Sequence, residues 1–258
     1  MNHQFFQQRG LYDPFFEHDA CGIGFIARLG GDSSHEVLKS GIEMLTRLDH
    51  RGGKGSDPNT GDGAGILVRI PHHYFLEEAK KVGIHLPKAG SYGVGMIFFP
   101  QEESLRIEQE EKIVEIAEKE GFEILWWRTV PLDPTSIGEG AKKSMPFIRQ
   151  LFLRYKFPLA SELDLERKLF LVRKQAENWV KNSSFPHSFY FASLSSRTIV
   201  YKGMLTPAQI TAFYLDLREE KFTTPFIMVH SRYSTNTFPS WERLIRTDTL
   251  FITARSTP

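Results

Sequence analysis

The feature that most constrains the fold is an alternation of short β-branched or aromatic segments with longer segments of helical periodicity. The strand-like segments are 21–29, 66–70, 92–99, 122–130, 145–152, 188–193, 198–202 and 226–230, and the helix-like segments are 33–49, 71–81, 102–120 and 161–181. Because neither type dominates, the pattern predicts an α+β fold. No internal repeat or low-complexity linker interrupts it, so we expect one domain with an inserted α/β subdomain near residues 90–155.

Local signals add detail to this pattern. Ser33 and Glu36 fit a capping box at the start of the first helix. A Ser-Ser turn between 188–193 and 198–202 predicts a β-hairpin, and Thr206 followed by Pro207 predicts a further helix start.

Composition excludes several classes of protein. The chain has 258 residues, 41% of them hydrophobic, and its 32 Lys and Arg balance 31 Asp and Glu to a net charge of +1. That balance disfavours nucleic acid as a partner, and no run approaches the roughly 20 apolar residues of a membrane helix. One cysteine cannot form an internal disulfide or supply a Cys cluster for metal, so we expect a cytoplasmic protein and no metal site.

The single cysteine, Cys21, lies at the start of a predicted strand between Ala20 and Gly22. A lone cysteine is more often a small buried hydrophobic residue than a nucleophile. No Cys-His-Asn arrangement is evident as a source of a base. If the chain were cut after Ala20, however, the new α-amine of Cys21, with a pKa near about 7.7–8.0, could accept the thiol proton.

A glycine-rich loop over residues 50–65 invites comparison with ligand-binding loops. It is not a P-loop, because Gly55 follows Lys54, and the dinucleotide fingerprint fails at Ile66. Asp57, Asn59 and Asp62 resemble part of a calcium loop whose later positions lack ligands. Composition alone favours a mobile surface loop, although glycines permit close approach of the backbone to a ligand.

Two further groups of polar residues are candidates for a binding site. His72 and His73 are adjacent, so on a helix they point in different directions and are expected at the surface rather than in a metal site. Arg232 follows a strand among hydroxyl residues. That setting suits bidentate binding of a carboxylate, and an exposed ion pair is an equally good interpretation.

Taken together, five motifs resemble the start of the large subunits of bacterial glutamate synthases, in order over residues 11–243. The motifs are Leu11-Tyr12-Asp13-Pro14, Glu17-His18-Asp19-Ala20-Cys21-Gly22-Ile23-Gly24, Leu48-Asp49-His50-Arg51-Gly52-Gly53, Thr60-Gly61-Asp62-Gly63-Ala64-Gly65 and His230-Ser231-Arg232-Tyr233-Ser234-Thr235-Asn236-Thr237-Phe238-Pro239-Ser240-Trp241. The resemblance implies a class-II glutamine amidotransferase domain with the N-terminal-nucleophile hydrolase fold, an αββα sandwich.

The resemblance also implies a mechanism. Residues 1–20 would be a leader whose removal exposes Cys21 as the nucleophile that converts glutamine to glutamate and ammonia, within a domain over residues 21–243. Arg232 would hold the substrate α-carboxylate, with Arg51 and Gly52 beside the nucleophile, and Tyr233, Ser234 and Thr235 would also bind substrate. No cofactor is expected in this chain. In the full enzyme the family uses FMN, an iron–sulfur cluster and an NADPH-oxidising small subunit to aminate 2-oxoglutarate.

The last fifteen residues, 244–258, depart from the family. There the family has a segment with His-Asn-Gly-Glu that forms the oxyanion hole. Back-translation of 244–258 with suitably chosen synonymous codons, read two bases later, gives His-Pro-Asn-Arg-Tyr-Ile-Ile-His-Asn-Gly-Glu-Ile-Asn-Thr. We therefore expect a frameshifted tail, a domain lacking its carboxy-terminal part, and low activity, because losing one oxyanion donor costs about a hundredfold or more in rate.

Two alternatives stay open at this point. One is a non-catalytic module that binds glutamine through Arg232. The other is the amidotransferase domain of a different class-II enzyme, which the stretch Thr60 to Gly65 disfavours.

Overall fold

The computed structural model describes residues 22–49, 57, 59–232, 240 and 241 of the chain. Of the proposed site residues, Cys21, Arg51, Gly52, Tyr233, Ser234 and Thr235 lie outside these residues, as do the leader 1–20 and the tail 244–258.

The observed elements follow the predicted alternation closely. They are β1 (Gly22–Ala27), α1 (His35–Arg47), β2 (Ala64–Arg69), α2 (His72–Lys81), β3 (Gly93–Phe99), α3 (Glu103–Lys119), β4 (Phe122–Thr129), η3 (Pro134–Ser136), α4 (Glu139–Lys143), β5 (Phe147–Tyr155), α5 (Glu162–Lys181), β6 (Tyr190–Ser195), β7 (Thr198–Gly203), α6 (Gln209–Phe213), η4 (Leu215–Arg218) and β8 (Phe226–Ser231).

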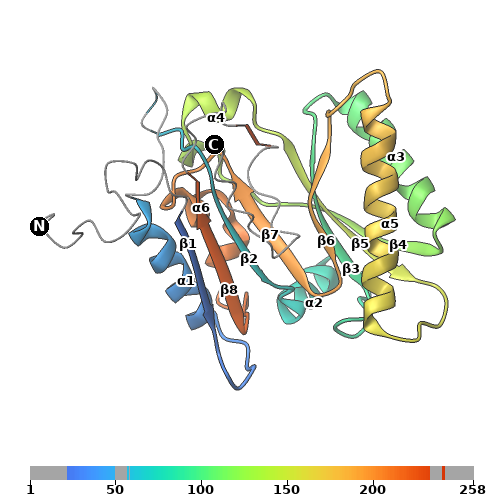
Figure 1. Ribbon diagram of the computed structural model, residues 1–258, viewed down its shortest axis with the longest axis horizontal. Helices are drawn as coiled ribbons and strands as arrows, with labels where there is room; N and C mark the ends of the chain where they lie inside the picture. Colours follow the sequence, from blue (N-terminus) through green and yellow to red (C-terminus); the bar gives the residue numbers. More distant parts are fainter. Residues whose placement is uncertain (1–21, 50–56, 58, 233–239, 242–258) are drawn as a thin grey trace, which may run out of the picture.

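The strands form two four-stranded antiparallel sheets. The first sheet has the order β1-β8-β2-β7 and the second the order β4-β5-β3-β6. Figure 1 shows α1 beside the first sheet and α3 with α5 beside the second, with the two sheets between them. This mixed arrangement fits the predicted N-terminal-nucleophile hydrolase sandwich. The segment expected as an inserted subdomain supplies β3, β4 and β5 of the second sheet.

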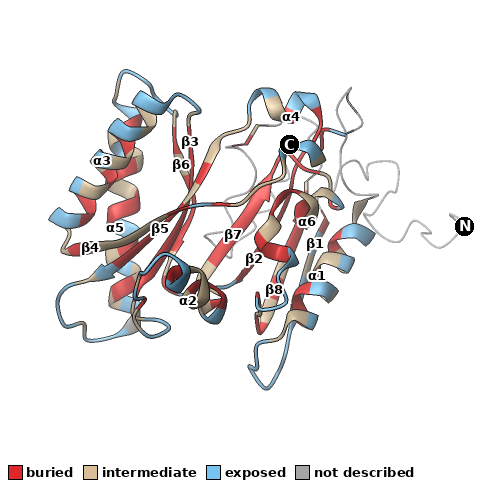
Figure 2. Ribbon diagram, turned by 180° about the vertical axis from the view of Figure 1, so that it is seen from behind, coloured by how far each residue is buried: buried red, intermediate tan, exposed pale blue. Residues whose placement is uncertain are grey.

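One hydrophobic core joins α1 and both sheets, and a second lies between the second sheet and the helices α3 and α5. Figure 2 shows buried residues concentrated on the strands, while exposed residues lie along the outer sides of the helices. Close packing of α1 on the first sheet requires Gly41, because a Cβ there would lie 2.3 Å from Cγ2 of Ile227. A glycine in a helix is therefore favoured by contact rather than by helix propensity.

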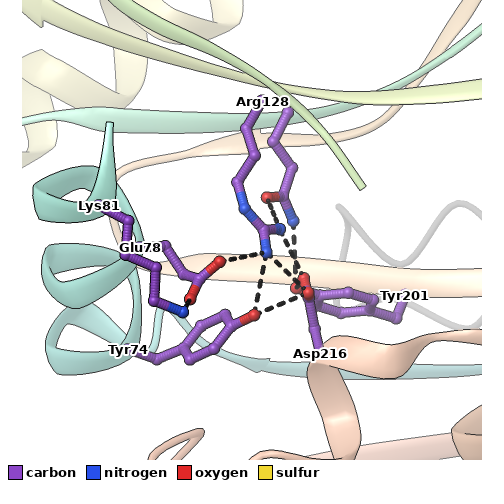
Figure 3. A network of polar contacts seen from close by, with 7 residues as sticks. Tyr74, Glu78, Lys81, Arg128, Tyr201 and Asp216 are labelled. Carbon is purple, nitrogen blue, oxygen red and sulfur yellow. Dashed lines mark hydrogen bonds and ion pairs between the residues drawn. The ribbon is translucent and has the colours of Figure 1, made fainter. Parts of the chain in front are cut away.

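A buried polar network also connects the two sheets (Figure 3). Arg128 of β4 donates to both carboxylate oxygens of Asp216, at 2.8 and 2.9 Å. Tyr74 of α2 and Tyr201 of β7 donate to the same carboxylate, and Gln150 of β5 accepts from Arg128. Each buried polar group thus has a partner from a different element, which specifies how the elements pack.

The structure corrects three local predictions. The strands at 188–193 and 198–202 do not form a hairpin, because β6 pairs with β3 and β7 with β2, in different sheets. The cap of α1 is Ser34, whose side chain accepts from the Val37 N–H, rather than Ser33. The helix predicted from Thr206 begins at Gln209, and the Thr206 N–H instead donates to the Gln209 side chain.

In the part of the chain that the structure describes, no helix combines the length and apolar character required to cross a lipid bilayer.

Candidate active site

The candidate site is built where β8 ends between the beginnings of β1 and β2. Gly22 of β1 and Ala64 of β2 both pair with Ser231, the last residue of β8. The next residue, Arg232, donates its backbone N–H to the Gly63 carbonyl at 2.8 Å. Three sequence motifs that are far apart in the chain therefore meet at one end of the first sheet.

The second part of the glycine-rich loop is buried, although composition favoured a surface loop, whereas Asn59 before it is exposed. Residues 60–65 are all buried, and the Thr60 hydroxyl donates to the Asp57 carboxylate at 2.8 Å. A Cβ on Gly61 would lie 2.3 Å from the backbone of Leu205, so only glycine allows this close approach.

Asp57 organises the start of this loop. Its carboxylate accepts from the backbone N–H of Asn59 at 3.0 Å, and that hydrogen bond, followed by the one from Thr60, lowers the Asp57 pKa below its ordinary value. The Asn59 carbonyl in turn accepts from Gly138 at 2.9 Å. From sequence, Asp57 was considered only as a calcium ligand. Thr60, with a hydroxyl three residues later, was the signal that the Asp57 side chain instead holds the local backbone turn.

Among the described residues, no three His, Cys, Asp or Glu side chains come together as a possible set of metal ligands. His72 and His73 of α2 lie at the opposite end of β2 from the candidate site, since α2 follows Arg69 and the site contains Ala64. His73 is exposed and His72 is half-buried.

His230 and Ser231 are the polar residues that sequence reasoning passed over. Their side chains are 8% and 0% exposed, and neither Nδ1 of His230 nor Oγ of Ser231 has a hydrogen-bond partner in the described part of the chain. Burial, and then the charge of Arg232, lower the pKa of His230 to about 4. The imidazole is therefore neutral at physiological pH. The sequence signal available for them was their place beside Arg232 in one motif.

The segment after β8 returns to the core at Trp241. Its indole is 4% exposed and donates to the Ala141 carbonyl at 3.1 Å, and its backbone carbonyl accepts from the Tyr190 hydroxyl. The motif from residue 230 to residue 241 is thus anchored at both ends, by β8 and by contacts with α4 and β6.

The fold has two antiparallel sheets, and the motifs singled out in the sequence meet where β1 begins. A family model of class-II glutamine amidotransferases matches residues 21–247, which is most of the chain. The chain belongs to the class-II glutamine amidotransferases, a family that implies the N-terminal-nucleophile hydrolase fold.

More particularly, this domain is homologous to those of glutamate synthases from bacteria, plants and yeast. It is 55% identical over 235 residues to the large chain of the NADPH glutamate synthase of Bacillus subtilis, covering 91% of this chain and 15% of that protein. It is 42% identical over 231 residues to ferredoxin-dependent glutamate synthase 2 of Arabidopsis thaliana, covering 90% and 14%. It is 38% identical over 240 residues to the NADH glutamate synthase of Schizosaccharomyces pombe, covering 91% and 11%.

The chain spans less than a sixth of the length of each of these relatives. The complete reactions named for these relatives are therefore those of proteins far longer than this chain.

Proposed function

We propose that this domain hydrolyses the side-chain amide of glutamine through Cys21 and supplies the ammonia for glutamate synthesis in a longer protein, with low activity in this chain because residues 244–258 depart from the oxyanion-hole segment of the family. The observation that carries the proposal is that the match to the amidotransferase family begins at residue 21. This residue directly precedes β1, whose first residue pairs with the last residue of β8. Cys21 immediately precedes Gly22, and Arg232 immediately follows Ser231, the residue paired with Gly22.

The first step is preparation of the nucleophile. Removal of residues 1–20 gives Cys21 a free α-amine, whose pKa of about 7.7–8.0 is close enough to neutrality for the amine to accept the thiol proton. The sulfur then attacks the amide carbon of glutamine. The proton passes to the leaving nitrogen, ammonia departs, and a thioester remains. Water cleaves the thioester and releases glutamate, restoring the thiol.

Substrate binding is assigned to residues around this nucleophile. The guanidinium of Arg232 is suited to the α-carboxylate of glutamine, because its planar donors match two carboxylate oxygens. Arg51 and Gly52 are proposed beside the nucleophile, and Tyr233, Ser234 and Thr235 along the substrate. The neutral imidazole of His230 in β8, two residues before Arg232, adds no second positive charge to the site.

The other parts of glutamate synthesis are proposed to lie elsewhere in the longer protein. FMN, an iron–sulfur cluster and the NADPH-oxidising subunit come from the resemblance alone. The chain has one cysteine, so it cannot provide the thiolates of a cluster. We propose that the protein acts in the cytoplasm.

A covalent label tests the proposal without requiring turnover. A diazoketone analogue of glutamine carries the same α-amino acid group and alkylates an active thiol. We expect mass spectrometry to find residues 1–20 removed and one adduct on Cys21, with no adduct in Cys21→Ser. Arg232→Lys should label at least about tenfold more slowly, because Lys keeps the charge and loses the bidentate geometry.

Arg154→Lys, a change of the same kind in an exposed ion pair with Glu123, is the matched control and should label at the wild-type rate. Glutamine binding by calorimetry, lost in Arg232→Lys, with no adduct on Cys21 would favour the non-catalytic module. Labelling at an unprocessed amino terminus would contradict the proposed base.

Residues 244–258 lie outside the described residues, so their origin by frameshift stays a prediction. The nucleotide sequence tests it. If the alternative frame lacks codons for His-Asn-Gly-Glu, the prediction is wrong.

A further inference from the structure

A cavity of about 430 Å³ lies at the end of the first sheet away from the candidate active site. It contacts Phe226, the first residue of β8, whereas the active site is built at Ser231, the last residue of the same strand. Five residues of a strand span roughly 17 Å, so the two sites are separate. The volume lies within the range of about 300–1,000 Å³ that suits small organic ligands.

The wall of the cavity comes from four regions of the fold. These are the exit of β2 into α2, the loop before β3, the turn between β6 and β7, and the start of β8, which meet near the lower ends of β2, β7 and β8 in Figure 1. The lining residues are Arg69, Ile70, His72, Ala89, Gly90, Tyr92, Ser196, Arg197, Thr198 and Phe226. The strand residues in the wall, Arg69, Thr198 and Phe226, belong to the first sheet, and the other segments include those that precede β3 and follow β6 of the second sheet.

The lining is basic. It includes the guanidinium residues Arg69 and Arg197 and no aspartate or glutamate. Glu166 of α5 accepts from both the backbone N–H and the hydroxyl of the lining residue Ser196, each at 2.6 Å. Because the lining residues include two arginines and no carboxylate, we expect the cavity to favour an anionic ligand.

Neutral donors complement the two arginines. The Tyr92 hydroxyl lies 3.0 Å from Nδ1 of His72, and burial, together with the neighbouring His73, lowers the His72 pKa. When the hydroxyl donates to Nδ1 of the neutral ring, the ring proton is on Nε2 and can donate to a bound anion. Ile70 and Phe226 give the same cavity an apolar side.

We propose that this cavity is a second ligand site, which binds a small phosphate monoester through Arg69 and Arg197 with its organic group against Ile70 and Phe226. Arginine forks match phosphate oxygens in bidentate geometry, and the hydroxyl of Thr198 and the imidazole of His72 satisfy the remaining acceptors. A ligand held by four segments that meet only in the fold binds the folded state alone, so it raises stability as it binds.

Titration calorimetry of the chain with phenyl phosphate, at constant ionic strength, tests the site. We expect saturable binding with a dissociation constant below about 1 mM. Arg69→Gln and Arg197→Gln should each weaken binding by about tenfold or more, because each removes a charge-assisted hydrogen bond. Both residues are exposed, so folding should persist. Arg167→Gln on α5, with the same change of charge at an exposed residue, should bind as the wild type does.

Ala89→Trp is a second variant that fills the cavity without changing its charge, and it should also abolish binding. Glutamine should not displace phenyl phosphate, because the active site is at the other end of the sheet. No saturable binding at about 10 mM, or equal losses in Arg167→Gln and the cavity variants, would overturn the proposal. Benzoate binding as tightly as phenyl phosphate would overturn the assignment to phosphate.

Discussion

At the scale of single residues, His230 shows how burial changes the chemistry of a side chain that looks ordinary in the sequence. Between Ile23 of β1 and Gly65 of β2 it is removed from water, and its pKa falls from 6.5 to about 4. The unfolded chain therefore binds a proton between pH 6.5 and 4 that the folded chain does not. In that window, stability decreases as pH falls.

We predict that His230 contributes a loss of about 2 kcal/mol in the free energy of unfolding between about pH 7.5 and pH 5. Above pH 6.5 the contribution vanishes, because the residue is neutral in both states. Urea unfolding at several pH values should show this slope in the wild type and a shallower one in His230→Gln.

The control is His73→Gln on α2, since His73 is exposed. It should retain the wild-type dependence on pH. Equal slopes in His230→Gln and wild type would show that the imidazole is not buried as a neutral group.

At the scale of elements, the start of α1 is decided by a tertiary contact. Ser33 and Ser34 are both good capping residues, and the capping-box spacing favours Ser33. In the structure Ser34 exchanges two backbone hydrogen bonds with Thr224, at 3.1 and 3.3 Å. This bridge holds Ser34 extended, with φ −145° and ψ 154°, so its side chain meets the Val37 N–H.

We predict that Ser34→Ala lowers the free energy of unfolding by about 1 kcal/mol, because the Val37 N–H loses its acceptor. Ser33→Ala is a matched control one residue away and should change stability by less than about 0.5 kcal/mol. Thermal and urea unfolding of the two variants distinguish the caps. A larger loss in Ser33→Ala would mean that the cap predicted from sequence is correct.

At the scale of the whole molecule, the network around Asp216 holds the two sheets and α2 together (Figure 3). Burial alone would lower the Arg128 pKa, but the hydrogen bonds and charge of Asp216 outweigh it and raise that pKa. Burial and the same carboxylate raise the pKa of Tyr201. Arg128 is thus held charged and Tyr201 neutral around the Asp216 carboxylate, and removing one of these groups would leave the others buried without that partner.

We predict that Asp216→Ala lowers the free energy of unfolding by about 3–5 kcal/mol, because Arg128 remains buried without its counter-charge. Glu123→Gln, in the exposed pair with Arg154 at 2.6 Å, should cost at most about 1 kcal/mol. The double variant Arg128→Met with Asp216→Leu should lose less than the sum of the single changes. Additive losses in urea unfolding would contradict coupling between the two residues.

The type and order of the eight strands and of α1, α2, α3 and α5 could be predicted from the sequence, because periodicity depends on residues that are close in the chain. The short elements η3, α4 and η4 carry too few residues to show such a period, and the sequence did not predict them. The bounds of α3 and α5 agree with prediction within a residue at each end. The motifs that identify the family are likewise local strings, so membership of the class-II amidotransferases was accessible before any coordinates.

Pairing was not accessible in this way. The sequence placed β6 and β7 in one hairpin, since they adjoin a short turn, whereas the fold separates them into two sheets. The free energy that decides such pairing comes from contacts between residues far apart in the chain, which local periodicity does not record. The same reason explains the loop at Thr60–Gly65, which is polar and glycine-rich in sequence and buried against Leu205 in the fold.

The sequence by itself therefore determined the family, the proposed nucleophile Cys21 and the carboxylate-binding role proposed for Arg232. Only the tertiary structure decided that β1, β2 and β8 bring these motifs to one end of a sheet. It also decided that His230 is neutral and that a basic cavity lies at the other end. The physical reason is that chemical identity belongs to each residue, whereas burial, charge environment and register arise only when distant segments come into contact.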